Sequence, residues 1–137
     1  MASIRVLVVE DFLPFRRLIC ATLGKKPDVE IIAEVSDGQE AVRKAEELQP
    51  DLILLDIGLP TLNGIAAARQ IRQLVPDSKI IFVTQESSED VVQEALSTGA
   101  LGYVAKTTMN GSLLAAVDAA LAGKPFISKN LAHLGSR

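Results

Sequence analysis

The sequence is poor in the residues on which several specialised classes of protein depend. Among its 137 residues there is one cysteine, Cys20, so the chain cannot form an internal disulfide bond. A disulfide-dependent fold is therefore excluded, and a single thiol is consistent with a reducing compartment. The chain has no tryptophan and one tyrosine, which leaves few rings that could stack on a flat aromatic cofactor.

Two further absences concern charge and hydrophobic length. Lys and Arg number 14 against 17 Asp and Glu, giving a net charge of −3. Direct nucleic-acid binding by this segment is therefore not expected, because it favours a basic face. No apolar run approaches the roughly 20 residues of a membrane span, and residues 1–9 do not have the pattern of a secretory signal. We expect a cytoplasmic protein without a membrane contact.

The sequence does contain a regular alternation of apolar runs and helical patterns. Most of the runs are rich in Val and Ile, as is typical of strands covered on both faces. Between the runs and after the last one, apolar residues recur at helical spacing. This alternation predicts an α/β fold in which helices cover both faces of a parallel sheet. The five predicted strands are residues 4–9, 29–35, 52–55, 79–83 and 101–105.

Capping and breaking residues place the boundaries of these elements. Asp37 and Ser87 are each followed three residues later by an acid, the spacing of a helix cap and its partner. Asn63 and Asn110 are further candidate N-caps. We expect one domain over residues 1–123. Residues 124–137 are expected to be a linker or C-terminal tail, because a glycine, a lysine and a proline break the helical pattern there.

Polar side chains follow four of the five predicted strands. Glu10 and Asp11 come after the first strand, Asp56 after the third, Thr84 after the fourth and Lys106 after the fifth. In an open parallel sheet, ligands bind beyond the carboxyl ends of the strands. We therefore expect three acids, one hydroxyl and one amine to meet at a single site.

The chemistry of this set is mutually consistent. Clustered carboxylates repel one another and favour a bound cation, and a site built from oxygen atoms suits Mg²⁺ or Mn²⁺. The metal would screen the charge on Asp56 and on an incoming phosphoryl group, so that Asp56 could attack phosphorus in line. Lys106 would pair with one phosphoryl oxygen as a point charge, and Thr84 would donate its hydroxyl to another.

Short motifs at these strand ends resemble those of response-regulator receiver domains, the phosphorylation switches of two-component signalling. Each motif alone is weak, but their order and their placement after successive strands make the set specific. The resemblance implies a flavodoxin-like, doubly wound (βα)5 fold with a parallel five-stranded sheet of order 2-1-3-4-5. It covers residues 4–121 and rests on Val8-Val9-Glu10-Asp11, Leu54-Leu55-Asp56-Ile57-Gly58-Leu59-Pro60, Asn63-Gly64, Val83-Thr84 and Gly102-Tyr103-Val104-Ala105-Lys106.

The resemblance also implies how the acids would share the metal. Asp56 would be the phosphoacceptor and, with Asp11, a direct metal ligand. The backbone carbonyl of Gly58 would complete the protein ligands, and Glu10 would act through a water molecule. Mg²⁺ is the implied cofactor, with Mn²⁺ as its substitute.

The remaining site residues would bind the phosphoryl group and report its presence. Lys106 would be the phosphate-binding lysine. Thr84 and Tyr103 would be the switch pair, in which the hydroxyl moves to the phosphoryl group while the aromatic ring turns inward. Phosphoryl transfer from a sensor histidine kinase to Asp56 would thereby change the surface formed by the fourth and fifth helices.

The end of the match adds an expectation about output. Residues 115–128 are similar to the NarL/FixJ class, whose receivers lead into a helix-turn-helix DNA-binding domain. The implied events are homodimerisation on phosphorylation and control of transcription, with DNA bound only through a domain that this chain does not contain. The chain would be a truncated form or a stand-alone receiver. It would be no enzyme, beyond assisting its own phosphorylation and dephosphorylation.

Two positions depart from the family pattern. Gln85 stands where a small residue is more frequent, and its larger side chain could shield the phosphoryl group from water. Thr107 follows Lys106 where many members have proline. The geometry of the Lys106–Thr107 peptide bond is therefore left open. Neither departure removes a reacting group.

Alternative functions differ from the receiver at particular residues. The main alternative is a receiver-like protein-interaction module that is never phosphorylated, although degenerate members usually lose an acid or the lysine, all of which this chain keeps. A flavin-binding protein of similar fold would have hydroxyl or glycine residues in place of Glu10 and Asp11. An aspartyl phosphohydrolase commonly has a second acid where this chain has Gly58, and the P-loop pattern GxxxxGK[ST] is absent.

Overall fold

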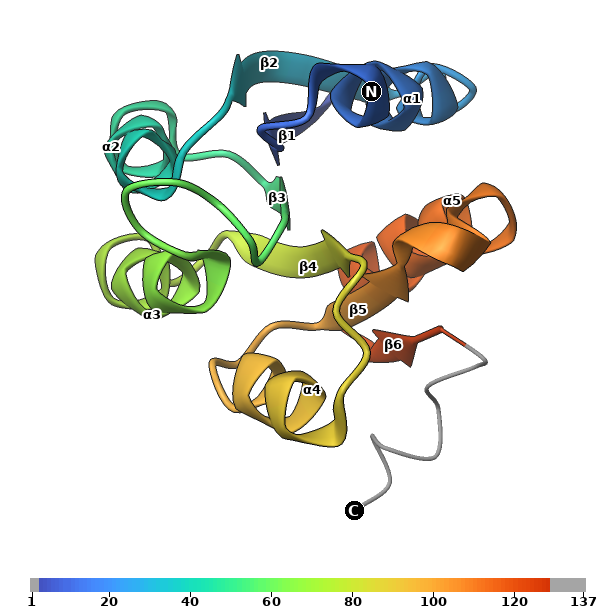
Figure 1. The fold of residues 1–137 in the computed structure, drawn as a ribbon. Coiled ribbons are helices and arrows are strands. Elements are labelled where there is room, and N and C mark those ends of the chain that lie inside the picture. The colour runs from blue at the N-terminus through green and yellow to red at the C-terminus, as the bar shows by residue number, and fades with distance from the viewer. Residues whose placement is uncertain (1–2, 129–137) are drawn as a thin grey trace.

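Strands and helices alternate along the chain and build one twisted sheet (Figure 1). The computed structural model describes residues 3–128. The strands are β1 (Ile4–Val9), β2 (Val29–Val35), β3 (Leu52–Leu55), β4 (Lys79–Thr84), β5 (Gly102–Ala105) and β6 (Phe126–Ile127). The helices are α1 (Leu13–Leu23), α2 (Gly38–Leu48), α3 (Gly64–Leu74), α4 (Glu89–Leu96), the short 3₁₀ helix η1 (Lys106–Thr108) and α5 (Met109–Leu121).

The strand order is β2-β1-β3-β4-β5-β6, and all neighbouring strands are parallel. The predicted flavodoxin-like order 2-1-3-4-5 is thus confirmed. The predicted number of five strands is wrong, because β6 adds a sixth strand within the segment expected to be a linker or tail. Residues 129–137 of that segment lie outside the described residues.

The sixth strand covers an edge of β5 that would otherwise expose unpaired backbone groups. The Phe126 N–H donates to the Leu101 carbonyl at 2.8 Å, and the Ser128 N–H donates to the Tyr103 carbonyl at 2.9 Å. Ser128 itself is fully buried. A strand of two residues is too short to show an alternating pattern, so the sequence signal for it is only an apolar pair after the last helix.

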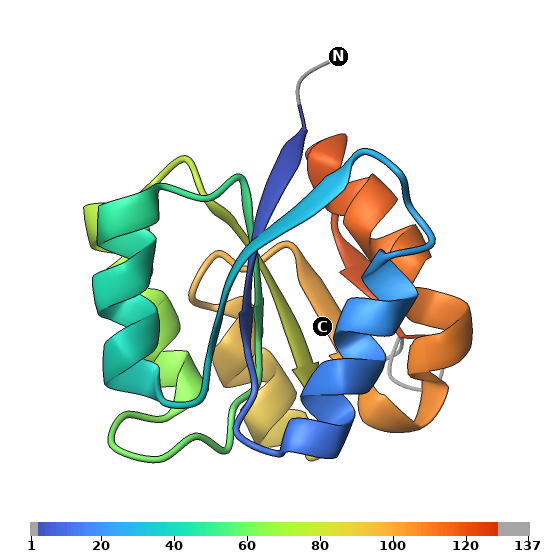
Figure 2. The same ribbon diagram turned by 90° about the horizontal axis from the view of Figure 1, so that it is seen from above.

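Helices cover the sheet on both faces (Figure 2). Val6 and Val8 of β1 belong to a core cluster shared with α1 and α5. Leu7 and Val9 of the same strand belong to a second cluster shared with α2, α3 and α4. This period of two follows from the pleat of a strand, and burial on both faces explains why the strands are continuously apolar.

Two of the four predicted helix caps, Asp37 and Asn63, are confirmed, whereas Asn110 lies inside α5 and Thr108 holds the N-cap position of that helix. The side chains of Asp37 and Asn63 accept hydrogen bonds from the N–H groups three residues later, at 2.7 and 3.0 Å. The prediction of Ser87 as the cap of α4 is wrong by one residue. Ser88 holds that position, and its hydroxyl accepts from the Val91 N–H at 3.4 Å. A side-chain cap satisfies an N–H group that the helix itself leaves free.

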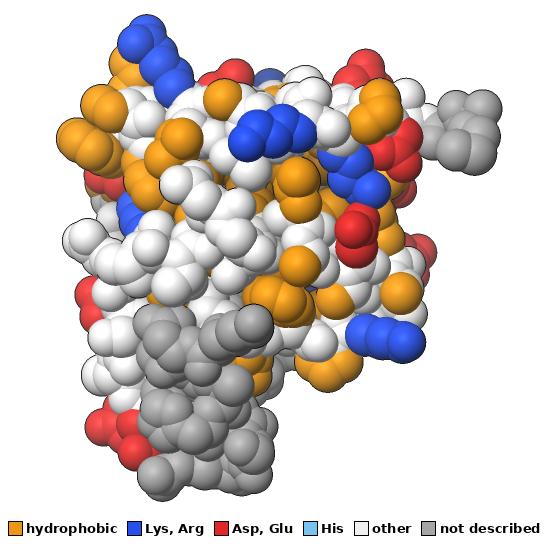
Figure 3. Space-filling view, turned by 90° about the vertical axis from the view of Figure 1, so that its right-hand side faces the viewer, with side chains coloured by type: hydrophobic (Ala, Val, Ile, Leu, Met, Phe, Trp, Pro, Cys, Tyr) orange, Lys and Arg blue, Asp and Glu red, His pale blue; other side chains and the backbone are white. Residues whose placement is uncertain are grey.

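One face of the described residues carries charges of both signs (Figure 3). The face on the α1 and α5 side shows Lys and Arg, Asp and Glu and hydrophobic side chains interspersed over its visible part (Figure 3). Such a mixture differs from the basic stripe that nucleic-acid binding favours. Within residues 3–128, none of the helices has both the length and the apolar character needed to cross a membrane.

Candidate functional site

The carboxyl ends of β1, β3, β4 and β5 surround a pocket of about 280 Å³. This is the position at which open parallel sheets bind ligands. Most of its lining residues are polar or charged. They are Glu10, Asp11, Phe12, Asp56, Gly58, Thr84, Gln85, Glu86 and Lys106.

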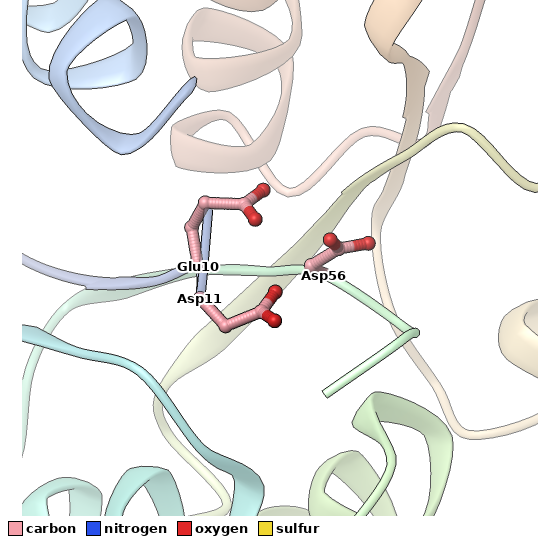
Figure 4. A group of neighbouring side chains, drawn as sticks. All are labelled: Glu10, Asp11 and Asp56. Atoms are coloured by element: carbon pink, nitrogen blue, oxygen red, sulfur yellow. The ribbon is translucent and has the colours of Figure 1, made fainter. Parts of the chain in front are cut away.

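Three carboxylates meet in this pocket. Glu10 and Asp11 leave the end of β1, Asp56 leaves the end of β3, and their side chains lie close together (Figure 4). One oxygen from each lies within 4.8 Å of the other two. Glu10 is fully buried and Asp56 is 6% exposed, whereas Asp11 is exposed. The grouping concentrates negative charge where little solvent can screen it.

Burial raises the pKa of the Glu10 carboxyl above its ordinary value, and the charge of Asp56 raises it further. The ion pair with Lys106 and the Phe12 N–H, which donates to Glu10 Oε2 at 3.1 Å, oppose this increase in the pKa. These two partners favour the charged form of Glu10, which burial disfavours.

Lys106 is the cation that balances the acids. Its Nζ lies 2.7 Å from Glu10 Oε1 and 3.0 Å from Asp56 Oδ2, and it also lies 4.4 Å from the centre of the Phe15 ring. Burial lowers the pKa of Lys106, but Glu10 and Asp56 raise it by more, so the pKa is above its ordinary value. The lysine is therefore protonated. The described chain has no cis peptide bond, so the bond between Lys106 and Thr107 is trans.

Backbone contacts hold the Asp56 carboxylate in place. Its Oδ1 accepts the Ile57 N–H at 2.7 Å, and its own N–H donates to the Val9 carbonyl at 3.1 Å. In the loop between β3 and α3, the Gly64 N–H donates to the Ile57 carbonyl at 2.7 Å. A Cβ at Gly64 would overlap the carbonyl oxygen of Asp56, so only glycine allows α3 to approach this closely.

Thr84 and Tyr103 are joined by a single loop residue. The Thr84 hydroxyl accepts the Glu86 N–H at 3.3 Å, and the Tyr103 hydroxyl donates to the Glu86 carbonyl at 2.8 Å. The Tyr103 ring is fully buried and lies 6.2 Å from the Phe82 ring, centre to centre. Burial raises the pKa of the Tyr103 hydroxyl, which is therefore protonated and can donate.

Comparison with known proteins assigns this arrangement to a family. The family model described as the response regulator receiver domain matches residues 6–118. The chain belongs to this family. The response regulators are signalling proteins, and several curated relatives of this receiver domain are transcriptional regulators.

The receiver domain is 40% identical over 129 residues to the transcriptional regulatory protein LiaR of Bacillus subtilis, covering 94% of this chain and 61% of LiaR. It is 33% identical to DegU of Brevibacillus brevis, covering 96% of this chain and 56% of DegU. The chain thus spans about three fifths of these relatives. A protein-glutamate methylesterase of Geobacter sulfurreducens is 37% identical over 108 residues, which are 29% of that enzyme.

Solved structures confirm the fold. A LuxR-family response regulator from Aurantimonas has a TM-score of 0.91 at 31% identity, covering 96% of this chain and 94% of the other. The response regulator domain of Thermotoga maritima CheB has a TM-score of 0.83 at 33% identity, covering 90% of this chain and 99% of the other. The relation to LuxR-family regulators supports the NarL/FixJ-like class inferred from residues 115–128.

The pocket of this receiver domain suits a divalent cation. Receiver domains generally use Mg²⁺ at an acidic pocket, and the donors here are carboxylate oxygens, as Mg²⁺ prefers. Glu10 Oε1 is buried and lies 2.7 Å from the Lys106 ammonium. The carboxylate oxygens of the three acids therefore fit a divalent cation, which would share Glu10 and Asp56 with the lysine.

The structure brings the predicted acids, Gly58, Thr84 and Lys106 to one pocket, while Tyr103 lies outside it and reaches it through Glu86. Sequence reasoning did not identify Phe15 or Glu86. Phe15 has helical apolar spacing and resembles a core residue. Glu86 acts through backbone groups, which leave no signal in side-chain patterns.

Proposed function

We propose that this receiver domain accepts a phosphoryl group on Asp56 from the phosphohistidine of a sensor histidine kinase, with Mg²⁺ as cofactor. The observation that carries the proposal is the Asp56 carboxylate, which shares one pocket with two other acids and with the Lys106 ammonium. This combination can hold a metal, a nucleophile and a phosphoryl group together.

Asp11, Asp56 and the carbonyl of Gly58 would hold the metal, with Glu10 acting through water. Bound Mg²⁺ would screen the charge between the carboxylates and the phosphoryl oxygens. An Asp56 oxygen attacks phosphorus as the bond from phosphorus to the histidine nitrogen breaks, and the histidine leaves with its electron pair. Lys106 is already 3.0 Å from Asp56 and can exchange a carboxylate partner for a phosphoryl oxygen.

The Thr84 hydroxyl would carry the change out of the pocket. It now accepts a long hydrogen bond of 3.3 Å from the Glu86 N–H, which is easily exchanged for one that it donates to a phosphoryl oxygen. Moving Thr84 would shift Glu86, whose carbonyl binds the Tyr103 hydroxyl at 2.8 Å. The β4–α4 loop is thus the element whose two positions phosphorylation would bias.

The outcome would be a change in the face formed by α4, β5 and α5. Curated relatives are transcriptional regulators, which supports a homodimer formed on phosphorylation and DNA binding through a separate domain. The pocket residues would serve the domain's own phosphorylation and not the turnover of a substrate. The domain would therefore be a switch and not an enzyme, and it would act in the cytoplasm.

Intact-protein mass spectrometry tests the proposal. The protein is incubated with acetyl phosphate, with Mg²⁺ or with EDTA. We expect one added phosphoryl group with Mg²⁺ and none with EDTA or in Asp56→Asn. Asp77→Asn is the matched control, because Asp77 is exposed and lies outside the pocket, and it should keep the adduct.

A second arm uses phosphorylated histidine kinase as the donor. Absence of an adduct with both donors would reject phosphorylation and leave an interaction module. An adduct that persists in Asp56→Asn would place the phosphoacceptor at another residue.

A further inference from the structure

Phe15 has an unusual position for a residue of an amphipathic helix. It is half-buried in the first turn of α1 and packs against the core cluster shared by α1 and α5. Its ring face, however, lies under the Lys106 ammonium, 4.4 Å from Nζ to the ring centre. This is within the distance at which an aromatic face attracts a cation. Phe15 is therefore both a packing residue and the third partner of the lysine.

The other two partners of Lys106 are carboxylates of the metal site. Nζ lies 2.7 Å from Glu10 Oε1 and 3.0 Å from Asp56 Oδ2. A divalent cation bound by the acidic cluster would draw on Asp56 directly and on Glu10 through water, and it would repel the ammonium. Among the contacts of the ammonium within residues 3–128, the Phe15 ring is the partner that a metal does not compete for, because the ring carries no donor oxygen.

We infer that Phe15 is a positioning residue, whose ring keeps the Lys106 ammonium in the pocket when a metal occupies the carboxylates. The inference rests on the proposed function, since it concerns the phosphate-binding lysine of that same site. Loss of the ring would let the flexible lysine side chain leave the pocket for solvent. The fraction of molecules that are ready to bind a phosphoryl group would then fall.

Phe15→Leu removes the aromatic face and keeps an apolar side chain of similar volume. With saturating Mg²⁺, we expect this variant to form the acetyl-phosphate adduct about two- to fivefold more slowly than the native protein, the ratio that matches an exposed cation–π contact. Phe15→Tyr keeps the ring and should retain the native rate. Phe126→Leu is the matched control, because it makes the same change at another half-buried phenylalanine, in β6, outside the pocket.

A spectroscopic measurement tests the contact without phosphorylation. The side-chain CH₂ protons next to Nζ lie near the ring face, so their NMR signals should be shifted upfield. The signals are assigned by their absence in Lys106→Met. We expect the upfield shift in metal-free protein, its persistence in saturating Mg²⁺, and its loss in Phe15→Leu.

Loss of the shift on addition of Mg²⁺ would overturn the inference, because the lysine would then have left the ring. A native rate in Phe15→Leu, or an equal loss in Phe15→Tyr, would also overturn it by showing that the ring face has no role of its own. If the native protein forms no adduct at all, the proposed function fails. The NMR shift still decides whether the Lys106 ammonium stays over the Phe15 ring when Mg²⁺ is bound.

Discussion

Removing the Lys106 ammonium should destabilise the metal-free protein. In Lys106→Ala, the fully buried Glu10 and the nearly buried Asp56 lose their cation and face each other as like charges. Removing one partner of a buried ion pair typically costs 3–5 kcal/mol. Because the Lys106 side chain is 14% exposed and Asp11 is exposed, we expect the low end, about 3 kcal/mol at neutral pH in EDTA.

The loss of unfolding free energy in Lys106→Ala should be larger at high pH than at low pH. Burial holds the pKa of Glu10 above its ordinary value of 4.5, and loss of Lys106 raises this pKa further. A raised folded-state pKa means that the folded protein binds the proton more tightly than the unfolded chain. The penalty is therefore fully present above the folded pKa. It disappears as the pH falls through that pKa towards 4.5.

Urea unfolding at pH 7.5 and pH 4.5, with EDTA or with Mg²⁺, measures these effects. We expect Mg²⁺ to stabilise Lys106→Ala more than the native protein, because the unpaired carboxylates bind the cation more strongly. Lys124→Ala is the control, since Lys124 is exposed in the loop before β6. A deficit below about 1 kcal/mol at pH 7.5, or one that neither acid nor Mg²⁺ reduces, would refute the reasoning about buried charge.

Three further substitutions test other features. Gly64→Ala should lower the free energy of unfolding by more than about 2 kcal/mol, because the added Cβ would overlap the Asp56 backbone. Gly111→Ala should raise it by about 0.5–1 kcal/mol, because Gly111 has open space inside α5. Urea titration measures both variants, and equal effects would contradict the packing argument. Ser128→Ala should lower the free energy of unfolding by about 1–3 kcal/mol, because the buried Ser128 hydroxyl accepts the Ala105 N–H at 2.8 Å. The specific measurement is hydrogen exchange of the Ala105 amide, which should become faster. Gln85→Ala should shorten the lifetime of the Asp56 adduct, because Gln85 lines the pocket and can shield it from water, and an unchanged decay rate of the adduct mass would remove that role.

Local patterns were sufficient to predict where the site lies. Glu10, Asp11, Asp56, Thr84 and Lys106 are far apart in sequence, yet all line one pocket. The reason is geometric, because parallel strands of one sheet point their carboxyl ends to the same edge. The residue that follows each strand is therefore at the site whenever the strands are correctly identified. The roles of these residues in phosphoryl transfer remain predictions.

The sequence could not determine the partners that hold these residues. Phe15 lies under Lys106 because α1 packs beside α5, which follows Lys106 closely in the chain, and its spacing alone is that of a core residue. Ser128 reaches Ala105 only after the chain beyond α5 has returned to the free edge of β5.

Such contacts join segments distant in the chain, and their geometry is set by helix packing and side-chain rotamers together. The sequence by itself determined the alternation of strands and helices and thus the edge at which the polar residues meet. Only the tertiary structure decided the contacts among them, because each contact depends on two segments whose separation is fixed by the packing of the whole core.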